Sequence, residues 1–214
     1  GGVSRERIGD EIRRMLTRPS RARAIDLMRS LGLEAAILGD APVSAGEGLR
    51  TLEGLDDDAD LPTALAAWAL DRGENGVAFQ KRLCLSNAET DDLMALLDGV
   101  ARARYDWDAM GTAQRKRLAS RGEFDRVLAI LRSDDPARAA ALRESVDGLA
   151  RTPGGLAPEP LVAGRTLIAH GVSPGPRFGA VLERVYDAQL EGRISDVDGA
   201  LELARSLLEA DAEG

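Results

Sequence analysis

The stretch that decides the fold is Leu161-Val-Ala-Gly-Arg-Thr-Leu-Ile-Ala-His-Gly-Val-Ser-Pro-Gly-Pro-Arg-Phe-Gly-Ala-Val-Leu182. Two short apolar segments in it are separated by a Ser-Pro-Gly-Pro turn, and a longer amphipathic helix follows. Proline is favoured at the first position of a helix, and glycine adopts backbone angles that other residues avoid. The pattern therefore predicts that Gly175 forms the turn and that Pro176 opens a helix. The free amides of that helix, beside Arg177, suit a phosphate oxygen.

This turn belongs to a longer pattern of glycine, leucine and proline. Its members are Leu161, Gly164, Arg165, Leu167, Gly171, Pro174, Gly175, Pro176, Arg177, Gly179, Leu182, Gln189, Gly192 and Ile194. The pattern resembles the C-terminal tail of bacterial tRNA nucleotidyltransferases, the CCA-adding enzyme and poly(A) polymerase family. That tail reads Gly-x-x-Leu, then Gly-x-x-Pro-Gly-Pro-x-x-Gly-x-x-Leu. Phe178 stands where an aliphatic residue is usual, and Thr166 where an acidic or amide residue is common.

Length and composition favour packed helices. The chain has 214 residues, enough for one large or two small domains, and 44% of them are apolar but only 3% aromatic. A core of Leu, Ala, Val and Ile is more typical of helices than of a sheet sandwich. No convincing alternating strand is present. We therefore predict an all-α fold, a multi-helix array with a smaller C-terminal helical tail domain.

The chain shows no apolar run near the roughly 20 residues that a membrane span needs, and no signal peptide at its start. Its single cysteine, Cys84, excludes an internal disulfide and fits a cytoplasmic protein. Leucines flank Cys84 on both sides, which predicts a buried small hydrophobe rather than a nucleophile.

The net charge of −8 at pH 7 argues against a nucleic-acid binder unless the cations are clustered. Basic and acidic segments alternate along the chain. Residues 1–40 hold 8 Lys or Arg against 6 Asp or Glu, and residues 102–151 hold 11 against 8. Residues 41–76 hold 2 against 8, and residues 152–214 hold 5 against 10. A basic face on an acidic molecule is therefore permitted.

The N-terminal segment carries a second likeness to the same family. Ser4 is a plausible cap for a helix running to about Thr17, and Ser4, Glu6, Arg7, Ile8 and Glu11 match the family's neck motif Ser-x-Glu-Arg-Ile-x-x-Glu. The resemblance implies that Ser4, Glu6, Arg7 and Glu11 brace neck helices beneath a nucleotide pocket. Intrahelical surface pairs, Glu6 with Arg13 or Arg7 with Glu11, are the alternative.

Further helices follow from period and capping signals. We expect a helix at 21–31, with Ile25, Leu27, Met28 and Leu31 on its buried side. Others are expected at 61–70 around Trp68, from a Ser86-x-x-Glu89 capping box to Val100, in three segments across 107–150 with Asp135 capping the third, and from about Asp196, capped by Ser195, to Leu208. Residues 39–60, rich in Gly, Pro and acid, are expected to form a loop. The Arg82–Asn87 segment also resembles the family's body. The predicted domains are 1–33 (lower neck helices), 34–150 (helical body) and 151–214 (helical tail).

Nothing in the chain forms the centre of a nucleotidyltransferase. In the family, Mg²⁺-binding carboxylates lie on a sheet of a separate N-terminal head, so Mg²⁺ and a nucleoside triphosphate are expected only in that head. The Asp pairs 58/60, 106/108 and 196/198 have no strand or Gly-rich loop beside them, and we interpret them as surface or capping groups. His170 is the only histidine and is expected at a helix end. We predict no catalytic or metal-binding residue.

The sequence therefore predicts the tRNA-binding, C-terminal part of such an enzyme, inactive alone because its head is absent. The resemblance and the cationic runs point to phosphate contacts at Arg165, Gly175, Arg177, Arg115, Lys116, Arg117, Arg13, Arg14 and Arg18. Two alternatives stay open. One is a helical protein-interaction module without RNA binding. The other is that the intact gene product is an active enzyme of which this is a piece.

Overall fold

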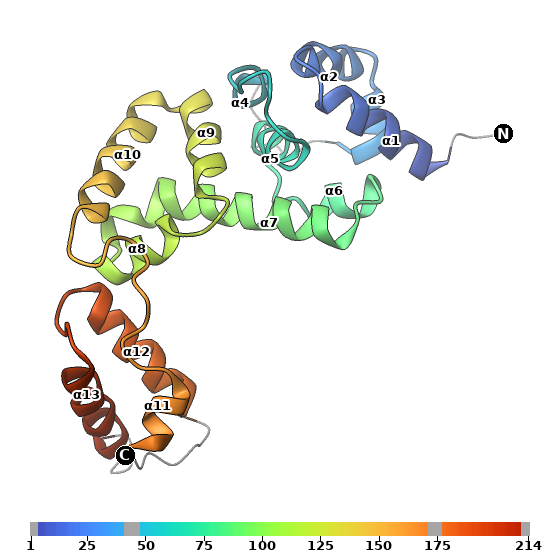
Figure 1. Ribbon diagram of the computed structural model, residues 1–214. Helices are drawn as coiled ribbons and strands as arrows, with labels where there is room; N and C mark the ends of the chain where they lie inside the picture. Colours follow the sequence, from blue (N-terminus) through green and yellow to red (C-terminus); the bar gives the residue numbers. More distant parts are fainter. Residues whose placement is uncertain (1–3, 41–47, 171–176, 211–214) are drawn as a thin grey trace. The chain divides into compact units, whose positions relative to one another are not determined.

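The computed structural model describes residues 4–40, 48–170 and 177–210 (Figure 1). All regular secondary structure in these ranges is helical, which confirms the predicted all-α fold. Within the same ranges, no helix combines the length and the apolar character that crossing a membrane requires.

The helices fall into two compact units. The first comprises residues 1–108 and 122–144, and the second 109–121 and 145–214. The α-helices are α1 Arg5–Leu16, α2 Arg21–Ser30, α3 Leu33–Leu38, α4 Arg50–Glu53, α5 Leu61–Asp71, α6 Val77–Arg82, α7 Asn87–Ala101, α8 Thr112–Ala119, α9 Phe124–Asp134, α10 Pro136–Ala150, α11 Gly164–Ala169, α12 Phe178–Leu190 and α13 Val197–Ala210. A π-helical turn, Arg102–Asp106, and a 3₁₀ turn, Trp107–Ala109, follow α7. This grouping joins the predicted neck and most of the predicted body in one unit and adds residues 109–121 and 145–150 to the tail.

Helix α5 is the centre of the first unit. Its residues from Thr63 to Ala69 are all buried, and it packs on α4, α7 and α9. Asp60 accepts a hydrogen bond from the Thr63 amide (2.9 Å) and so caps the helix where the apolar run begins. Trp68 meets Phe79 edge to face, with ring centroids 4.9 Å apart. The predicted Ala-rich buried helix is therefore confirmed.

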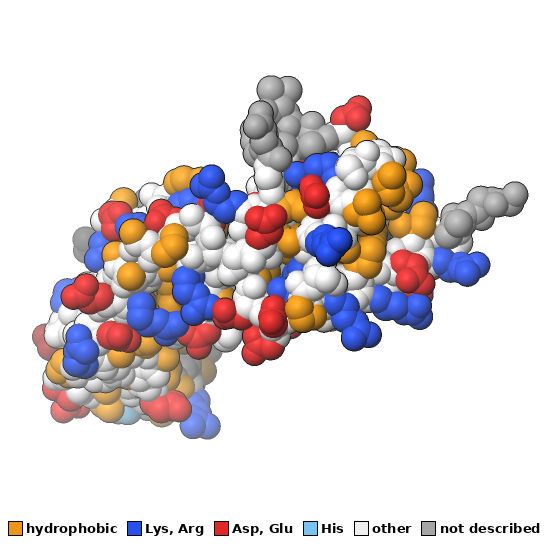
Figure 2. All heavy atoms as spheres, turned by 90° about the horizontal axis from the view of Figure 1, so that it is seen from above, with side chains coloured by type: hydrophobic (Ala, Val, Ile, Leu, Met, Phe, Trp, Pro, Cys, Tyr) orange, Lys and Arg blue, Asp and Glu red, His pale blue; other side chains and the backbone are white. Residues whose placement is uncertain are grey.

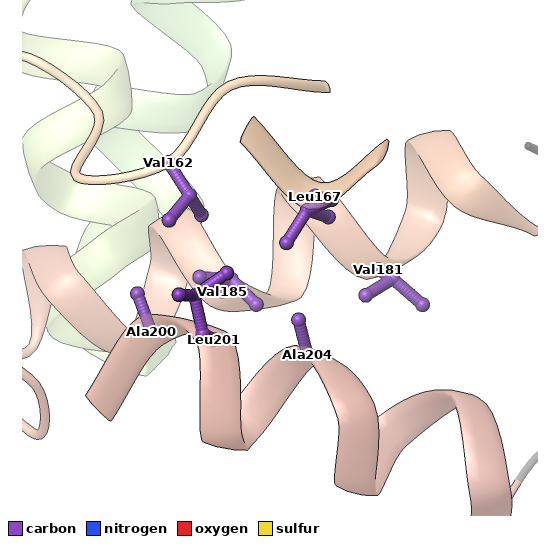
Figure 3. Packing of buried hydrophobic residues seen from close by; sticks show 7 residues of the cluster. All are labelled: Val162, Leu167, Val181, Val185, Ala200, Leu201 and Ala204. Carbon is purple, nitrogen blue, oxygen red and sulfur yellow. The ribbon is translucent and has the colours of Figure 1, made fainter. Parts of the chain in front are cut away.

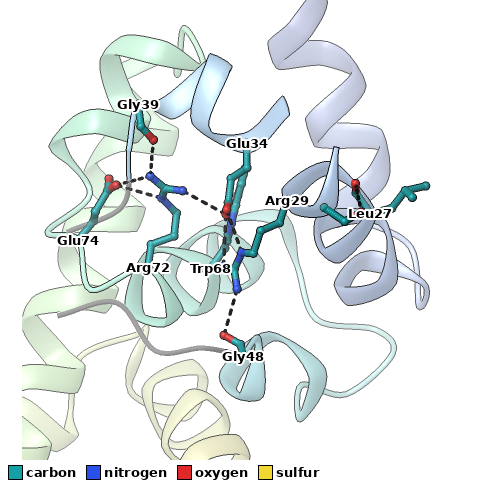
Figure 4. A network of polar contacts seen from close by, with 9 residues as sticks. Leu27, Arg29, Glu34, Gly39, Gly48, Trp68, Arg72 and Glu74 are labelled. Carbon is teal, nitrogen blue, oxygen red and sulfur yellow. Dashed lines mark hydrogen bonds and ion pairs between the residues drawn. The ribbon is translucent and has the colours of Figure 1, made fainter. Parts of the chain in front are cut away.

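A buried polar network ties α3 to α5 (Figure 4). The Glu34 carboxylate accepts hydrogen bonds from Arg29 Nε (2.9 Å) and Trp68 Nε1 (2.7 Å) and pairs with Arg72 at 3.2 Å. Arg72 also donates to Glu74 (2.8 Å) and to the Gly39 carbonyl (3.0 Å). Burial raises the pKa of Glu34, but the hydrogen bonds and charges of its cationic partners outweigh burial and lower it. The network therefore holds ionised Glu34 in the interior.

The tail part of the second unit has its own apolar core (Figure 3). Helices α11, α12 and α13 and the segment before α11 supply its buried side chains. They are Val162, Leu167, Val181, Val185, Ala200, Leu201 and Ala204. Leu161 is fixed beside this core because its amide donates to Gln189 Oε1 (3.0 Å) on α12. Leucines of the tail pattern, such as Leu161 and Leu167, therefore pack in or against this core.

The local capping predictions hold in most places. Ser4 accepts from the Arg7 amide, Ser86 and Glu89 form a reciprocal capping box, and Asp135 accepts from the Arg138 amide. At α13 the cap is wrong by one residue: Asp196, rather than Ser195, accepts from the Gly199 amide (2.8 Å). The start predicted at Pro176 lies outside the described residues.

Three other predictions were wrong. The 39–60 loop contains α4, because Leu49, Leu52 and Leu55 are buried against the core. Leu27 and Leu31, expected on the buried side of α2, are 58% and 64% exposed.

The third wrong prediction is the burial of Cys84, which is exposed. Its φ of 51° is left-handed, and it lies in the turn between α6 and α7. The turn keeps Leu83 buried, whereas the cysteine side chain is exposed.

Replacing Glu34 by Gln should lower the free energy of unfolding by about 3 kcal/mol, because it removes the buried counter-charge of Arg29 and leaves Arg72 with Glu74 alone. Urea denaturation at neutral pH measures this value. The matched control is Glu53→Gln on α4, whose side chain is exposed and whose change we expect to stay within about 0.5 kcal/mol. Equal stability of the two variants would show that the network contributes nothing.

Candidate nucleic-acid interface

Arg13, predicted to contact phosphate, is instead a tie between α1 and α7. Its Nε and Nη2 donate to the two Glu89 carboxylate oxygens at 2.8 and 3.0 Å, and Nη2 also donates to the Cys84 carbonyl (3.1 Å). Glu89 at the same time accepts from the Ser86 amide (2.7 Å) in the capping box of α7. The guanidinium group is therefore used within the fold.

The Arg13–Glu89 pair shifts both pKa values. The hydrogen bond from Arg13 is the largest cause that lowers the pKa of Glu89, from 4.5 to about 2, and the Ser86 hydrogen bonds add to it against a smaller effect of burial. The same hydrogen bond raises the pKa of Arg13. The carboxylate is consequently ionised throughout the neutral and mildly acidic range.

The remaining cations of α1 point away from the core. Arg7, Arg14 and Arg18 are all exposed, and Arg14 keeps 72% of its side chain in solvent while pairing with Glu11 at 2.9 Å. The two intrahelical pairs considered from sequence, Arg7 with Glu11 and Glu6 with Arg13, do not form within the described residues. Arg14–Glu11 and Arg13–Asp10 form instead. Ser4 caps α1, and the bracing role that the resemblance implies for the neck motif stays a prediction.

The run Arg115-Lys116-Arg117 on α8 does not form one surface. Arg115 is half-buried and takes part in an interaction of its own. Lys116 is only 2% exposed. Arg117 is half-buried against α12. Consecutive helical residues point about 100° apart, so three adjacent cations face three directions.

Arg117 joins α8 to α12. Its Nε donates to Asp187 (2.6 Å), its Nη2 pairs with Glu183 (2.7 Å), and the guanidinium lies 5.0 Å from the centre of the Tyr186 ring. Burial lowers the pKa of Arg117, but the hydrogen bond and charge of Asp187, with Glu183, more than offset this and raise it. Two carboxylates and an aromatic face therefore compete with any phosphate for this arginine.

The tail places its predicted cations at the surface. Arg165 on α11 is exposed, and so is Arg177, the residue before α12, which has an interaction of its own. Gly175 lies outside the described residues. His170 ends α11, as predicted, and its Nδ1 donates to the Thr166 carbonyl (2.9 Å). Arg165 and Arg177 are thus both exposed, as a phosphate contact requires.

The acidic pairs serve as the predicted caps and surface groups. Asp60 caps α5, Asp196 caps α13, and Asp108 pairs with Arg138 at 2.9 Å. In the described ranges, no cluster of three or more His, Cys, Asp or Glu side chains has a geometry that would hold a metal ion.

Comparisons of the chain with protein-family models, with curated proteins and with solved structures gave no match. The likeness to tRNA nucleotidyltransferases accordingly rests on the motifs quoted above.

Sequence reasoning missed the burial of Lys116. The sequence has only two lysines against 26 arginines, so a lysine inside an arginine-rich helix is itself a signal.

Glu89→Gln should remove a stabilisation that depends on pH. Because the folded pKa of Glu89 is lowered, its contribution is present above the unfolded value of 4.5 and is lost as pH falls toward about 2. At pH 7 we expect a loss of about 1–2 kcal/mol after allowing for solvent screening. The difference from the unsubstituted chain should shrink below about pH 4.

Denaturant unfolding followed by circular dichroism at several pH values tests this prediction. The control is Glu11→Gln on α1, whose side chain is 67% exposed and whose change should alter stability by less than about 0.5 kcal/mol at every pH. A Glu89→Gln deficit that stays constant with pH would contradict the assigned cause.

Proposed function

We propose that this chain binds structured RNA, in keeping with the resemblance of its tail and neck motifs to tRNA nucleotidyltransferases. The observation that carries the proposal is the exposed arginine face of α1. Arg7, Arg14 and Arg18 are all exposed. In the part of the chain that the structure describes, no buried carboxylate pairs with them, and the partner of Arg14, Glu11, is itself 67% exposed. Arginine is the side chain best suited to phosphate because its planar group donates two parallel hydrogen bonds.

The spacing of these arginines suits a nucleic-acid backbone. At 100° per residue, positions 7 and 14 lie about 20° apart around the helix, and Arg18 follows just beyond its end. The rise of 1.5 Å per residue separates Arg7 from Arg14 by about 10 Å. One helix face therefore offers a cationic row along which an RNA strand can lie.

The net charge of −8 argues against nucleic-acid binding, but the charge of one local surface can differ from that of the whole chain. Many arginines of the chain are neutralised inside the fold by named carboxylates, such as Arg13 by Glu89 and Arg117 by Asp187. Figure 2 shows positive side chains exposed near the amino-terminal end of the described chain. Backbone phosphates bind to such a local patch whatever the charge of the rest of the molecule, as long as the salt concentration is moderate.

The tail contributes a second pair of exposed arginines, Arg165 and Arg177. No described side chain caps the amino end of α12, next to Arg177. A helix amino end beside an arginine attracts an anion. In an RNA complex these groups would contact backbone phosphates, so binding would follow A-form shape more than base sequence.

Replacing Arg7, Arg14 and Arg18 together by Gln should weaken tRNA binding at least about tenfold at low salt, because three phosphate contacts are lost. The slope of log Kd against log salt should fall by about 2 to 3. Filter binding of a tRNA across a salt series measures both quantities.

The matched control changes the same amount of charge elsewhere. Arg132, Arg143 and Arg205 are exposed, and their joint replacement by Gln should leave the affinity within about threefold. If both triple variants lose the same affinity for tRNA, the loss is due to net charge alone. If neither variant loses affinity, the α1 face is not the RNA-binding site.

A second candidate function is a helical protein-interaction module. It is favoured by the exposure of Leu27, Leu31 and Leu33, which are 58%, 64% and 47% accessible. Figure 2 shows hydrophobic side chains exposed among charged ones over this part of the molecule. Neighbouring exposed leucines are typical of protein contact surfaces. Such a module would bind tRNA no better than an unstructured polyanion such as heparin, and the same filter assay measures this.

A further inference from the structure

The second unit contains a cavity lined by Lys116, one of the residues that the sequence predicts to contact phosphate. It has a volume of about 500 Å³ and lies among the first turn of α8, the segment 152–161 and the chain from the end of α12 to the start of α13. Pro153, Leu161 and Ile194 form part of its apolar wall, and Thr112, Lys116 and Ser195 supply polar groups. Small-molecule sites typically have volumes of 300–1,000 Å³ and this mixture of wall and polar groups.

Lys116 distinguishes this cavity from an ordinary surface hollow. Its residue is 2% exposed, and among the described residues its ammonium group has no hydrogen-bond or ion-pair partner. The other two equally buried cations are fully engaged. Arg21 donates to the carbonyls of Leu16, Asp56 and Asp57, and Arg72 pairs with Glu34 and Glu74.

An ammonium group on a side chain this buried has little contact with water, and a ligand or water in the cavity can complete its hydrogen bonds. The cavity that Lys116 lines is where such a group can reach it.

The amino end of α8 adds partial positive charge beside the same cavity. Thr112 is the first residue of α8, and Lys116 lies one turn later, on the same helix face. The first-turn amides of a helix have no intrahelical acceptor and carry partial positive charge. One carboxylate, that of Glu191, also lines the cavity, but Arg193 donates to it at 2.7 Å. The available charge in the cavity is therefore positive.

We propose that this cavity binds an organic phosphate of nucleotide size. The phosphate would lie between the Lys116 ammonium and the first turn of α8, and the base and ribose against the wall formed by Pro153, Leu161 and Ile194. A phosphate has enough acceptor oxygens for an ammonium, helix amides and a threonine hydroxyl together. The site is separate from the arginine face of α1 and does not depend on it.

The same chemistry has two possible sources, a free mononucleotide or the phosphorylated end of an RNA. Adenosine 5′-monophosphate and a 5′-phosphorylated tetranucleotide are therefore both used as probes. Equal affinities assign the site to the free nucleotide. A tighter tetranucleotide, with the loss of that advantage on dephosphorylation, assigns it to an RNA end.

Calorimetric titration of the full chain tests the proposal. We expect adenosine 5′-monophosphate to bind with a submillimolar Kd and adenosine at least about tenfold more weakly. Lys116→Met, which keeps the length of the side chain and removes its charge, should weaken the nucleotide about tenfold or more and change adenosine binding by less than about twofold.

The chain provides a matched control, because Lys81 is its only other lysine and is exposed. Lys81→Met should leave nucleotide binding unchanged. In the unsubstituted chain, the nucleotide should also protect Lys116, and not Lys81, from an amine-directed label read by mass spectrometry. This second measurement keeps the proposal testable if Lys116→Met fails to fold.

Three results would overturn the proposal. The first is no saturation by the nucleotide or the phosphorylated tetranucleotide up to about 10 mM. The second is equal nucleotide affinity in the unsubstituted and Lys116→Met proteins. The third is labelling of Lys116 that the bound nucleotide does not slow. None of them bears on tRNA binding by α1, so the two proposals fail independently.

Discussion

Buried guanidinium groups tie together helices that a core of leucine and alanine specifies only loosely. Arg21 donates to three carbonyls on two separate segments, and Arg72 bridges α5 to the carboxylates of Glu34 and Glu74. Arg13 fixes α1 to the capped start of α7. With five donors in a rigid plane, arginine satisfies several acceptors at once, and each tie therefore specifies both distance and orientation. The arrangement of the first unit depends on these ties.

This use of arginine changes how the charge of the chain is interpreted. A guanidinium group paired with a carboxylate contributes little to an external field, because the two charges largely cancel. The proposed RNA-binding face is consequently defined by which arginines the fold leaves exposed. Arg14 shows the distinction: one residue from Arg13, it keeps most of its side chain in solvent, whereas Arg13 is held by a residue 76 positions away.

Structural features that depend only on residues close in sequence, such as most helix caps, were predicted correctly. Helix caps at Ser4, Ser86 and Asp135 were found because the donor and acceptor lie three residues apart. The exposure of Leu27 was missed because helical period identifies an apolar face but says nothing of whether another element covers it. The partner of Arg13 was unpredictable for the same reason. Its position depends on how α1 and α7 meet, which no local pattern contains.

Whether cations on a helix form one basic surface depends on their spacing along the sequence. A run such as Arg115–Arg117 looks like the strongest basic patch in the sequence, yet a turn of 100° per residue disperses it, and it yields one buried lysine and two half-buried arginines. Arginines seven and four residues apart look dilute but share a face. The same geometry explains why the two sites proposed here differ in chemistry: a solvated row of guanidinium groups suits an extended backbone, whereas a single ammonium inside a walled cavity suits one phosphate group.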